Sequence, residues 1–94
     1  MTITAASATA QQTAQVTVYS KPACVQCVAT KRKMGKLAIE HDTIDLTQDE
    51  VSMDLVQALG YVQAPVVVVR DMAGEVLAHW SGFNPDRIKE LAAA

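Results

Sequence analysis

Cys24 and Cys27 are the only two cysteines of this 94-residue chain, and two residues separate them. If Cys24 begins a helix, Cys27 lies one turn further along, and side chains at positions i and i+3 of a helix are near neighbours. Their separation is then close to the one that a disulfide requires. The spacing therefore predicts a pair that can change between dithiol and disulfide, and the chemistry it favours is thiol–disulfide exchange.

The two cysteines are expected to have different roles. A thiolate is the form that attacks a disulfide, and the unpaired N–H groups and the dipole at a helix start favour an anion. Cys24 holds that position, Lys21 can add positive charge nearby, and we expect Cys24 to reach solvent as the nucleophile. Cys27 is expected to point toward the core and to act as the resolving thiol, which closes the internal disulfide.

Three other interpretations of the pair remain open. The cysteines could supply half of a zinc site, but only His41 and His79 remain as typical further ligands, and their spacing matches no finger or ribbon. They could be inert core residues, although their place at a helix start argues against this. They could also share an iron–sulfur cluster between two chains, although clusters usually take four thiolates. We expect no metal site.

The elements around the pair follow from the hydrophobic pattern. β-branched and aromatic residues predict a first strand over 16–19, and Pro22 excludes helix just before it. A helix is predicted over 24–38, and a less regular second strand over 41–46. The stripe of the helix that is expected to face the core consists of Cys27, Thr30, Met34, Leu37 and Ala38.

A second helix is predicted to extend to Leu59. Thr47 and Glu50 have the spacing of a capping box before it, and Gly60 has the residue type that commonly ends a helix. Leu46 and Val51 have the spacing of the accompanying hydrophobic staple. No role is predicted for Asp45.

The C-terminal part of the chain reads as a hairpin and a third helix. Four consecutive valines, 66–69, predict a strand buried on both faces. A turn at 71–74 leads to its partner strand over 75–80. A loop is expected at 80–83, and Asn84 and Pro85 then begin the last helix. The whole order is β-α-β-α-β-β-α, an α/β fold with a four-stranded mixed sheet and three helices.

Length and composition predict one small domain. Half of the 94 residues are hydrophobic, and residues 1–14, with almost nothing large to bury, are expected to be a disordered extension before a single domain at 15–94. The net charge of −2 is too small to indicate nucleic acid or a membrane surface as a partner. No run of about 18 apolar residues could span a bilayer. Because the N-terminus does not resemble an export signal, we expect a cytoplasmic location.

Several blocks of the sequence resemble a known family. The segment Thr17–Pro22 that leads into the Cys-x-x-Cys pair, together with Ala64-Pro65 before the valine strand, resembles the glutaredoxins, small members of the thioredoxin fold. Four blocks narrow the resemblance to the NrdH-type redoxins, over about residues 15–91. These blocks are Cys24–Cys27, Ala58–Tyr61, Gln63–Val66 and Trp80–Phe83.

The resemblance implies a function that the spacing alone does not. It implies a redoxin that donates electrons to class Ib ribonucleotide reductase and is re-reduced by thioredoxin reductase with NADPH. The protein itself would then bind no cofactor and act as a monomer. The resemblance also implies a cis bond before Pro65 and a backbone contact from Ala64 to an incoming polypeptide. The implied partner-binding set is Lys21, Val25, Gln26, Ala64, Pro65, Trp80, Ser81, Gly82 and Phe83.

The sequence departs from the related patterns at two places. Glutaredoxins that use glutathione usually carry a Gly-Gly pair and an acidic residue after the last strand, where this chain has Trp80–Phe83. Glutathione binding is therefore not expected. The NrdH-type redoxins often have a basic residue where this chain has Asn84, so a network anchored by that base is not expected either. A glutathione-coupled glutaredoxin remains the first alternative function, and a metal or iron–sulfur carrier the second.

Overall fold

The computed structural model describes residues 14–93 of the chain. Of the extension predicted over residues 1–14, only Ala14 is within this range, and it belongs to the first strand. The elements are β1 (Ala14–Ser20), α2 (Val25–Lys36), β2 (Asp42–Asp45), the short 3₁₀ helix η1 (Leu46–Gln48), α3 (Glu50–Ala58), β3 (Val66–Asp71), β4 (Val76–Ser81) and α4 (Pro85–Ala93). Apart from η1, their order is the predicted one. None of the helices in the described range is long and apolar enough to cross a membrane.

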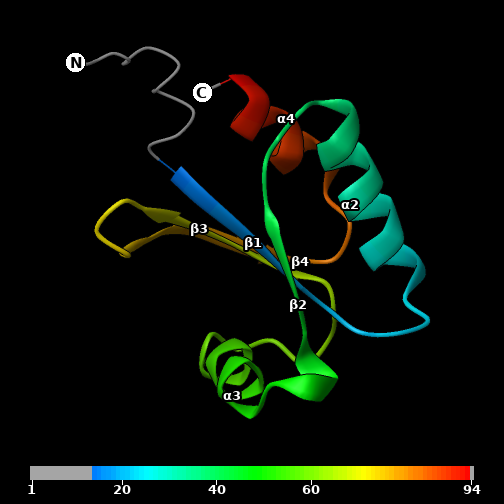
Figure 1. Ribbon diagram of the computed structural model, residues 1–94, viewed down its shortest axis with the longest axis vertical. Helices are drawn as coiled ribbons and strands as arrows, with labels where there is room; N and C mark the ends of the chain where they lie inside the picture. The colour runs from blue at the N-terminus through cyan, green and yellow to red at the C-terminus, as the bar shows by residue number, and fades with distance from the viewer. Residues whose placement is uncertain (1–13, 94) are drawn as a thin grey trace.

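The four strands form one mixed sheet in the order β2-β1-β3-β4 (Figure 1). β1 pairs parallel with β2 and antiparallel with β3, and β3 pairs antiparallel with β4. A parallel pair needs a crossover connection, which α2 supplies, whereas the tight turn after β3 is enough for the hairpin. This is the mixed topology that the sequence predicts for the thioredoxin fold.

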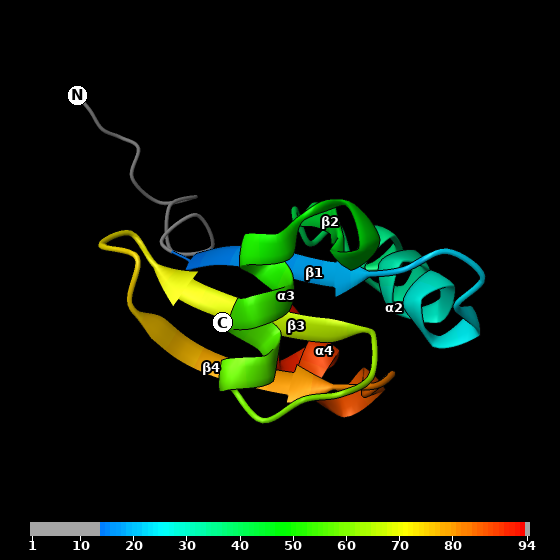
Figure 2. The same cartoon turned by 90° about the horizontal axis from the view of Figure 1, so that it is seen from below.

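Helices cover both faces of the sheet. α2 and α4 lie on one face and α3 lies on the other, where it crosses in front of the strands in Figure 2. The four valines of β3 alternate between the two cores, because successive side chains of a strand point to opposite faces. Val67 and Val69 pack in the core that contains Met34 of α2, whereas Val66 and Val68 pack in the core on the α3 side. The prediction of a strand buried on both faces is confirmed.

Helix α2 is shorter than the predicted range 24–38. It ends at Lys36, because Ala38 adopts a left-handed φ of 56° and turns the chain away. The N–H of Ile39 donates to the carbonyl of Met34 at 2.9 Å and that of Ala38 to Gly35 at 3.1 Å, which is the bonding pattern of a Schellman motif. The prediction that Ala38 faces the core is wrong, and this residue is exposed.

The predicted capping box before α3 is also wrong. The hydroxyl of Thr47 donates to the carboxylate of Asp45 at 2.6 Å, and Thr47 lies within η1. Asp49 caps α3 instead, and its carboxylate accepts from the backbone N–H groups of Val51 and Ser52. Val51 is exposed, so the predicted staple is not formed. The Asp49 carboxylate caps the helix in place of the Thr47 hydroxyl, and a charged acceptor makes the stronger hydrogen bond.

Candidate active site

One end of the sheet gathers most of the predicted site residues. β1 ends at Ser20 and β4 ends at Ser81, whereas the antiparallel strand β3 begins between them at Val66. Val66 pairs with Tyr19 on one side and with Ser81 on the other. The loop after β1 leads to Cys24, the loop before β3 contains Ala64 and Pro65, and the loop after β4 contains Gly82 and Phe83. The strand register therefore brings together three segments that are distant in sequence.

The two cysteines form a disulfide at the start of α2, with their Cα atoms 5.2 Å apart. Cys24 is the N-cap of the helix, and its Sγ accepts a hydrogen bond from the backbone N–H of Cys27 at 3.1 Å. The predicted pairing and the predicted position at the helix start are thus confirmed. The first turn of α2 contains no acidic residue, so no carboxylate there compensates the positive end of the helix dipole.

The exposure of the two sulfur-bearing residues differs in the predicted direction but less than expected. Cys24 is 9% exposed and Cys27 is 1% exposed. Cys24 is therefore nearly buried, since its sulfur is bonded to Cys27 and folds back over the first turn. Between them, Val25 is 83% exposed and Gln26 is also exposed. The two residues between the cysteines therefore present their side chains to solvent.

The side chain of Gln26 connects the cysteine segment to the loop after β4. Its Oε1 accepts a hydrogen bond from the backbone N–H of Phe83 at 3.0 Å. The neighbouring N–H of Gly82 donates to the carbonyl of Pro65 at 2.9 Å. A Cβ at Gly82 would lie 3.1 Å from Gln26 Oε1, and its φ of +82° also favours glycine. Gln26 thus has a structural partner that the sequence did not reveal.

The peptide bond between Ala64 and Pro65 is cis, as the resemblance implied. Pro65 is fully buried and Ala64 is half-buried. Ser81 fastens this loop from the neighbouring strand, since its Oγ donates to the carbonyl of Gln63 at 3.3 Å. A partner can therefore meet the loop through Ala64 but not through the side chain of Pro65.

Trp80 does not belong to an exposed docking surface, and that prediction is wrong. β4 extends to Ser81, so Trp80 lies on the strand, where it pairs with Val67 and is only 7% exposed. Its alternation places it in the core on the α2 and α4 side. The guanidinium of Arg87 covers the ring at 4.9 Å from the centroid. Phe83, by contrast, is 39% exposed and remains available to a partner.

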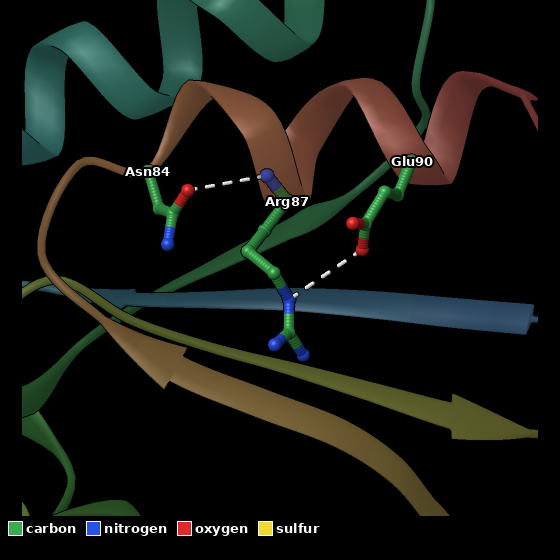
Figure 3. A network of polar contacts seen from close by, with 3 residues as sticks. All are labelled: Asn84, Arg87 and Glu90. Carbon is green, nitrogen blue, oxygen red and sulfur yellow. Dashed lines mark hydrogen bonds and ion pairs between the residues drawn. The ribbon is translucent and has the colours of Figure 1, made fainter.

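Arg87 belongs to a small network at the start of α4 (Figure 3). Asn84 accepts the backbone N–H of Arg87 at 3.2 Å, which confirms its predicted role as helix cap. The Nε of Arg87 lies 3.7 Å from a carboxylate oxygen of Glu90. Asn84 therefore caps the helix, and Arg87, one turn further along, places its guanidinium over Trp80.

A groove of about 320 Å³ lies on the α3 side of this sheet end. Lys21 and Ala64 line it, and these are the two predicted partner-binding residues that it contains. The rest of its lining comes mainly from η1, α3 and the loop before Pro65, with Met53, Val56 and Tyr61 among the apolar members. These residues were not predicted as part of a site, because the apolar stripe of α3 has the pattern of an ordinary core face.

The two histidines that could complete a zinc site are engaged elsewhere. Nδ1 of His41 lies 2.9 Å from the carbonyl oxygen of Ile39, and Nδ1 of His79 lies 2.7 Å from the hydroxyl of Tyr61. Within residues 14–93, no group of three or more His, Cys, Asp and Glu side chains could hold a metal ion. In this part of the chain the cysteine pair therefore has no further ligands of these types beside it.

Comparison with known proteins agrees with this geometry. A glutaredoxin family model matches residues 16–73. The glutaredoxin-like protein NrdH of Escherichia coli K12 is 35% identical over 80 residues, which cover 85% of this chain and 91% of the relative. NrdH of Salmonella typhimurium is 37% identical over 76 residues, or 81% of this chain and 86% of the relative.

A solved structure extends the agreement to three dimensions. The NrdH-redoxin of Escherichia coli superposes with a TM-score of 0.72 at 34% identity, over 82% of this chain and 93% of that one. The family match includes both cysteines and the cis proline of this chain. The chain therefore belongs to the glutaredoxin family and, within it, to the NrdH-type redoxins, which are thiol–disulfide oxidoreductases.

Proposed function

We propose that this redoxin reduces a disulfide in another protein. The observation that carries the proposal is the nearly buried disulfide at the start of α2 with exposed apolar side chains around it. Val25 is 83% exposed, Val62 is 94% exposed and Phe83 is 39% exposed, and all three belong to the segments that meet at this sheet end. Exposed apolar groups that surround a reactive centre are typical of a protein-binding surface.

The reaction begins from the dithiol form. The Cys24 thiolate attacks one sulfur of the target disulfide, the target S–S bond breaks, and one target thiolate leaves. Cys27 then loses its proton and attacks the Cys24 sulfur of the mixed disulfide, which releases the second target thiolate. The target gains two electrons and two protons, and the redoxin is left with the Cys24–Cys27 disulfide. The difference in burial between the cysteines supports this assignment of nucleophile and resolving thiol.

The partner surface in this proposal excludes Trp80. It consists of Val25, Gln26 and Phe83, whose segments are joined by a hydrogen bond, and of Lys21, Val62 and Ala64, which line the groove. Ser81 and Gly82 support this surface through their hydrogen bonds to Gln63 and Pro65. The backbone of Ala64 offers hydrogen bonds to an extended segment of the target, because Ala64 precedes β3 and is half-buried. The groove next to it can receive an apolar side chain of that segment.

The electron source and acceptor complete the proposal. Class Ib ribonucleotide reductase is the proposed acceptor, and thioredoxin reductase restores the dithiol with electrons from NADPH through its own flavin. The redoxin would bind no cofactor itself and would act as a monomer in the cytoplasm, where the reducing environment favours the dithiol. The related Escherichia coli protein has been described as having a thioredoxin-like activity profile, which supports this electron source.

A coupled assay tests the electron source. The purified redoxin is mixed with insulin as a disulfide substrate and with NADPH and either thioredoxin reductase, or glutathione and glutathione reductase. We expect NADPH oxidation with thioredoxin reductase and only background oxidation with glutathione. Turnover with the glutathione system alone would instead establish a glutathione-coupled glutaredoxin.

Trapping with Cys27→Ser tests the acceptor. The variant retains Cys24 but has no resolving thiol, so it is expected to accumulate a mixed disulfide with oxidised class Ib reductase. The matched control is the double variant with Cys24→Ser, which should trap nothing. If the single variant does not form an adduct with that reductase, the proposed acceptor is wrong, whereas the coupled assay still tests the chemistry.

A further inference from the structure

Thr30 carries a buried hydroxyl that has no hydrogen-bond partner. It is 0% exposed, and among the described residues its Oγ1 and the indole nitrogen of Trp80 are the two buried side-chain polar atoms without one. Leaving a buried hydroxyl unpaired lowers stability, so such groups are uncommon and call for an explanation. The disulfide form of this protein therefore contains an unused hydrogen-bonding group in its core.

The hydroxyl lies one turn from the resolving cysteine, on the same buried face of α2. Cys27 is 1% exposed, and Thr30 follows it at i+3. The Cβ atoms of such a pair are about 5–6 Å apart on a helix, and side chains tilt toward the N-terminus of the helix. The side chain of Thr30 therefore leans toward the turn that contains Cys27.

Reduction changes what the Cys27 sulfur can do. In the disulfide its Sγ is held by Cys24, and Thr30 Oγ1 makes no hydrogen bond to it. When the S–S bond breaks, the Cys27 side chain can rotate, and its sulfur becomes a thiol that donates or a thiolate that accepts. A hydroxyl can serve both forms, because it carries one donor and two acceptor lone pairs.

The surroundings offer few competing partners. Besides the unpaired indole nitrogen of Trp80, which lies on β4, the buried polar side chains in the part of the chain that the structure describes are Thr17, Ser20, Thr30 and Ser52, and none of them is charged. Ser52 already donates to Asp49 at 3.0 Å, whereas Thr17 and Ser20 lie on β1. Of the four, only Thr30 lies on the helix of Cys27.

We propose that Thr30 is a positioning residue of the dithiol form, whose hydroxyl pairs with the Cys27 sulfur once the disulfide is reduced. The pairing stabilises the dithiol relative to the disulfide and holds the Cys27 sulfur for its attack on the mixed disulfide. The inference depends on the dithiol–disulfide chemistry of this redoxin and is independent of the electron source and acceptor proposed above.

Redox equilibrium measurements on Thr30→Val and Thr30→Ser test the proposal. Each full-length protein is equilibrated with mixtures of reduced and oxidised dithiothreitol, and its free thiols are counted by alkylation and mass spectrometry. In the reaction, one dithiothreitol gives two electrons and two protons, its two sulfurs form a ring disulfide, and the Cys24–Cys27 bond opens to two thiols. Valine has the shape of threonine without the hydroxyl, whereas serine keeps the hydroxyl.

We expect Thr30→Val to change the equilibrium constant with dithiothreitol by about threefold to tenfold toward the protein disulfide. This is the factor that corresponds to the loss of one hydrogen bond. A tenfold shift corresponds to a potential about 30 mV more negative for a two-electron couple. Thr30→Ser should remain within about twofold of the wild type. Equal behaviour of the valine variant and the wild type, or equal shifts in both variants, would overturn the role of the hydroxyl.

A measurement on the unaltered protein keeps the test decisive if a variant does not fold. At a pH at which Cys27 is a thiolate, the hydroxyl proton of Thr30 should move downfield in the proton NMR spectrum when the disulfide is reduced, because the sulfur can then only accept a hydrogen bond. An unchanged resonance contradicts the proposal. If the wild-type cysteines do not exchange with dithiothreitol at all, the redox function itself fails, and this outcome differs from both results on Thr30.

Discussion

Helices α2 and α3 begin with different capping groups. At α3 the carboxylate of Asp49 accepts from the backbone N–H of Val51 at 3.1 Å and of Ser52 at 3.3 Å, and Glu50 adds a second acid to the first turn. At α2 the cap is the sulfur of Cys24, which accepts a single N–H bond, and the first turn has no acid. A neutral sulfur is a weak acceptor, whereas a carboxylate is a strong one.

The two helix starts differ in how far acidic groups already satisfy them. Acids satisfy the free N–H groups and the positive dipole end of α3 in the folded protein. The same features at α2 remain available to a negative charge on Cys24 after reduction. An acidic residue in the first turn of α2 would stabilise the helix, but it would also oppose the thiolate. The weaker cap is therefore compatible with a thiolate at Cys24.

The largest effect is expected from Cys24→Ser. Serine is a better N-cap than cysteine, so the variant should be as stable as the wild-type dithiol form or slightly more stable. Disulfide reduction should nevertheless fall to the uncatalysed rate, because an alcohol does not replace the thiolate. Insulin reduction and thermal unfolding under reducing conditions measure the two effects. Turnover near the wild-type rate would remove Cys24 from the mechanism.

Asp49→Ala is expected to affect stability and not activity. Loss of this cap should lower the free energy of unfolding by about 1–2 kcal/mol, which denaturant titration can measure. Turnover should stay at the wild-type value, because α3 does not carry the cysteines. Asp49→Asn is the matched control, since its side-chain oxygen can still cap the helix. A large loss of turnover in a folded Asp49→Ala protein would contradict the separation of the two helix starts.

The C-terminal ends of the same helices provide a third test. Both end in a Schellman motif, but α3 places Gly60 at the left-handed position with φ of 95°, and α2 places Ala38 there with φ of 56°. Exchanging the residue types should give opposite effects of about 0.5–1 kcal/mol, destabilising for Gly60→Ala and stabilising for Ala38→Gly. Chemical denaturation of the two variants checks the signs. Two changes of the same sign would show that the end geometry does not control stability.

The smallest expected effect concerns Asp45, which caps η1 just before α3. Hydrogen bonds from the hydroxyl and then the backbone N–H of Thr47 hold the pKa of this carboxyl below its ordinary value of 3.8. Because the folded-state pKa is depressed, the stabilising contribution is present above pH 3.8 and is lost as the pH falls through the folded-state value. The stability difference between wild type and Asp45→Asn should therefore shrink in acid. A difference that is constant from pH 6 to pH 2 would contradict this assignment.

The predictions that succeeded depend on short stretches of sequence. The four valines from Val66 to Val69 predicted a strand buried on both faces, and Asn84 was recognised as the cap of α4. In both cases the residues that decide the structure are within a few positions of one another. The capping of α3 failed for a related reason, because Thr47 and Asp49 are both suitable caps. The choice between them depended on the bond that Thr47 makes to Asp45.

Two features of the site that were not predicted depend on distant residues. Trp80 was expected on the docking surface, and its burial follows from its pairing with Val67 and from Arg87 above the ring. Gln26 was identified as a site residue, but its hydrogen bond to Phe83 joins positions 57 residues apart. No local pattern in the sequence contains such contacts.

The sequence by itself determined the reactive pair, the order of the elements and the family. These depend on residue types at fixed spacing, and the N–H groups and dipole of a helix start favour a thiolate there. Only the tertiary structure decided that Cys24 is nearly buried, that Trp80 belongs to the core and that the hydroxyl of Thr30 has no partner in the disulfide form. Burial and pairing are properties of the packed sheet and helices together, since they depend on which distant side chains the strand register brings into contact.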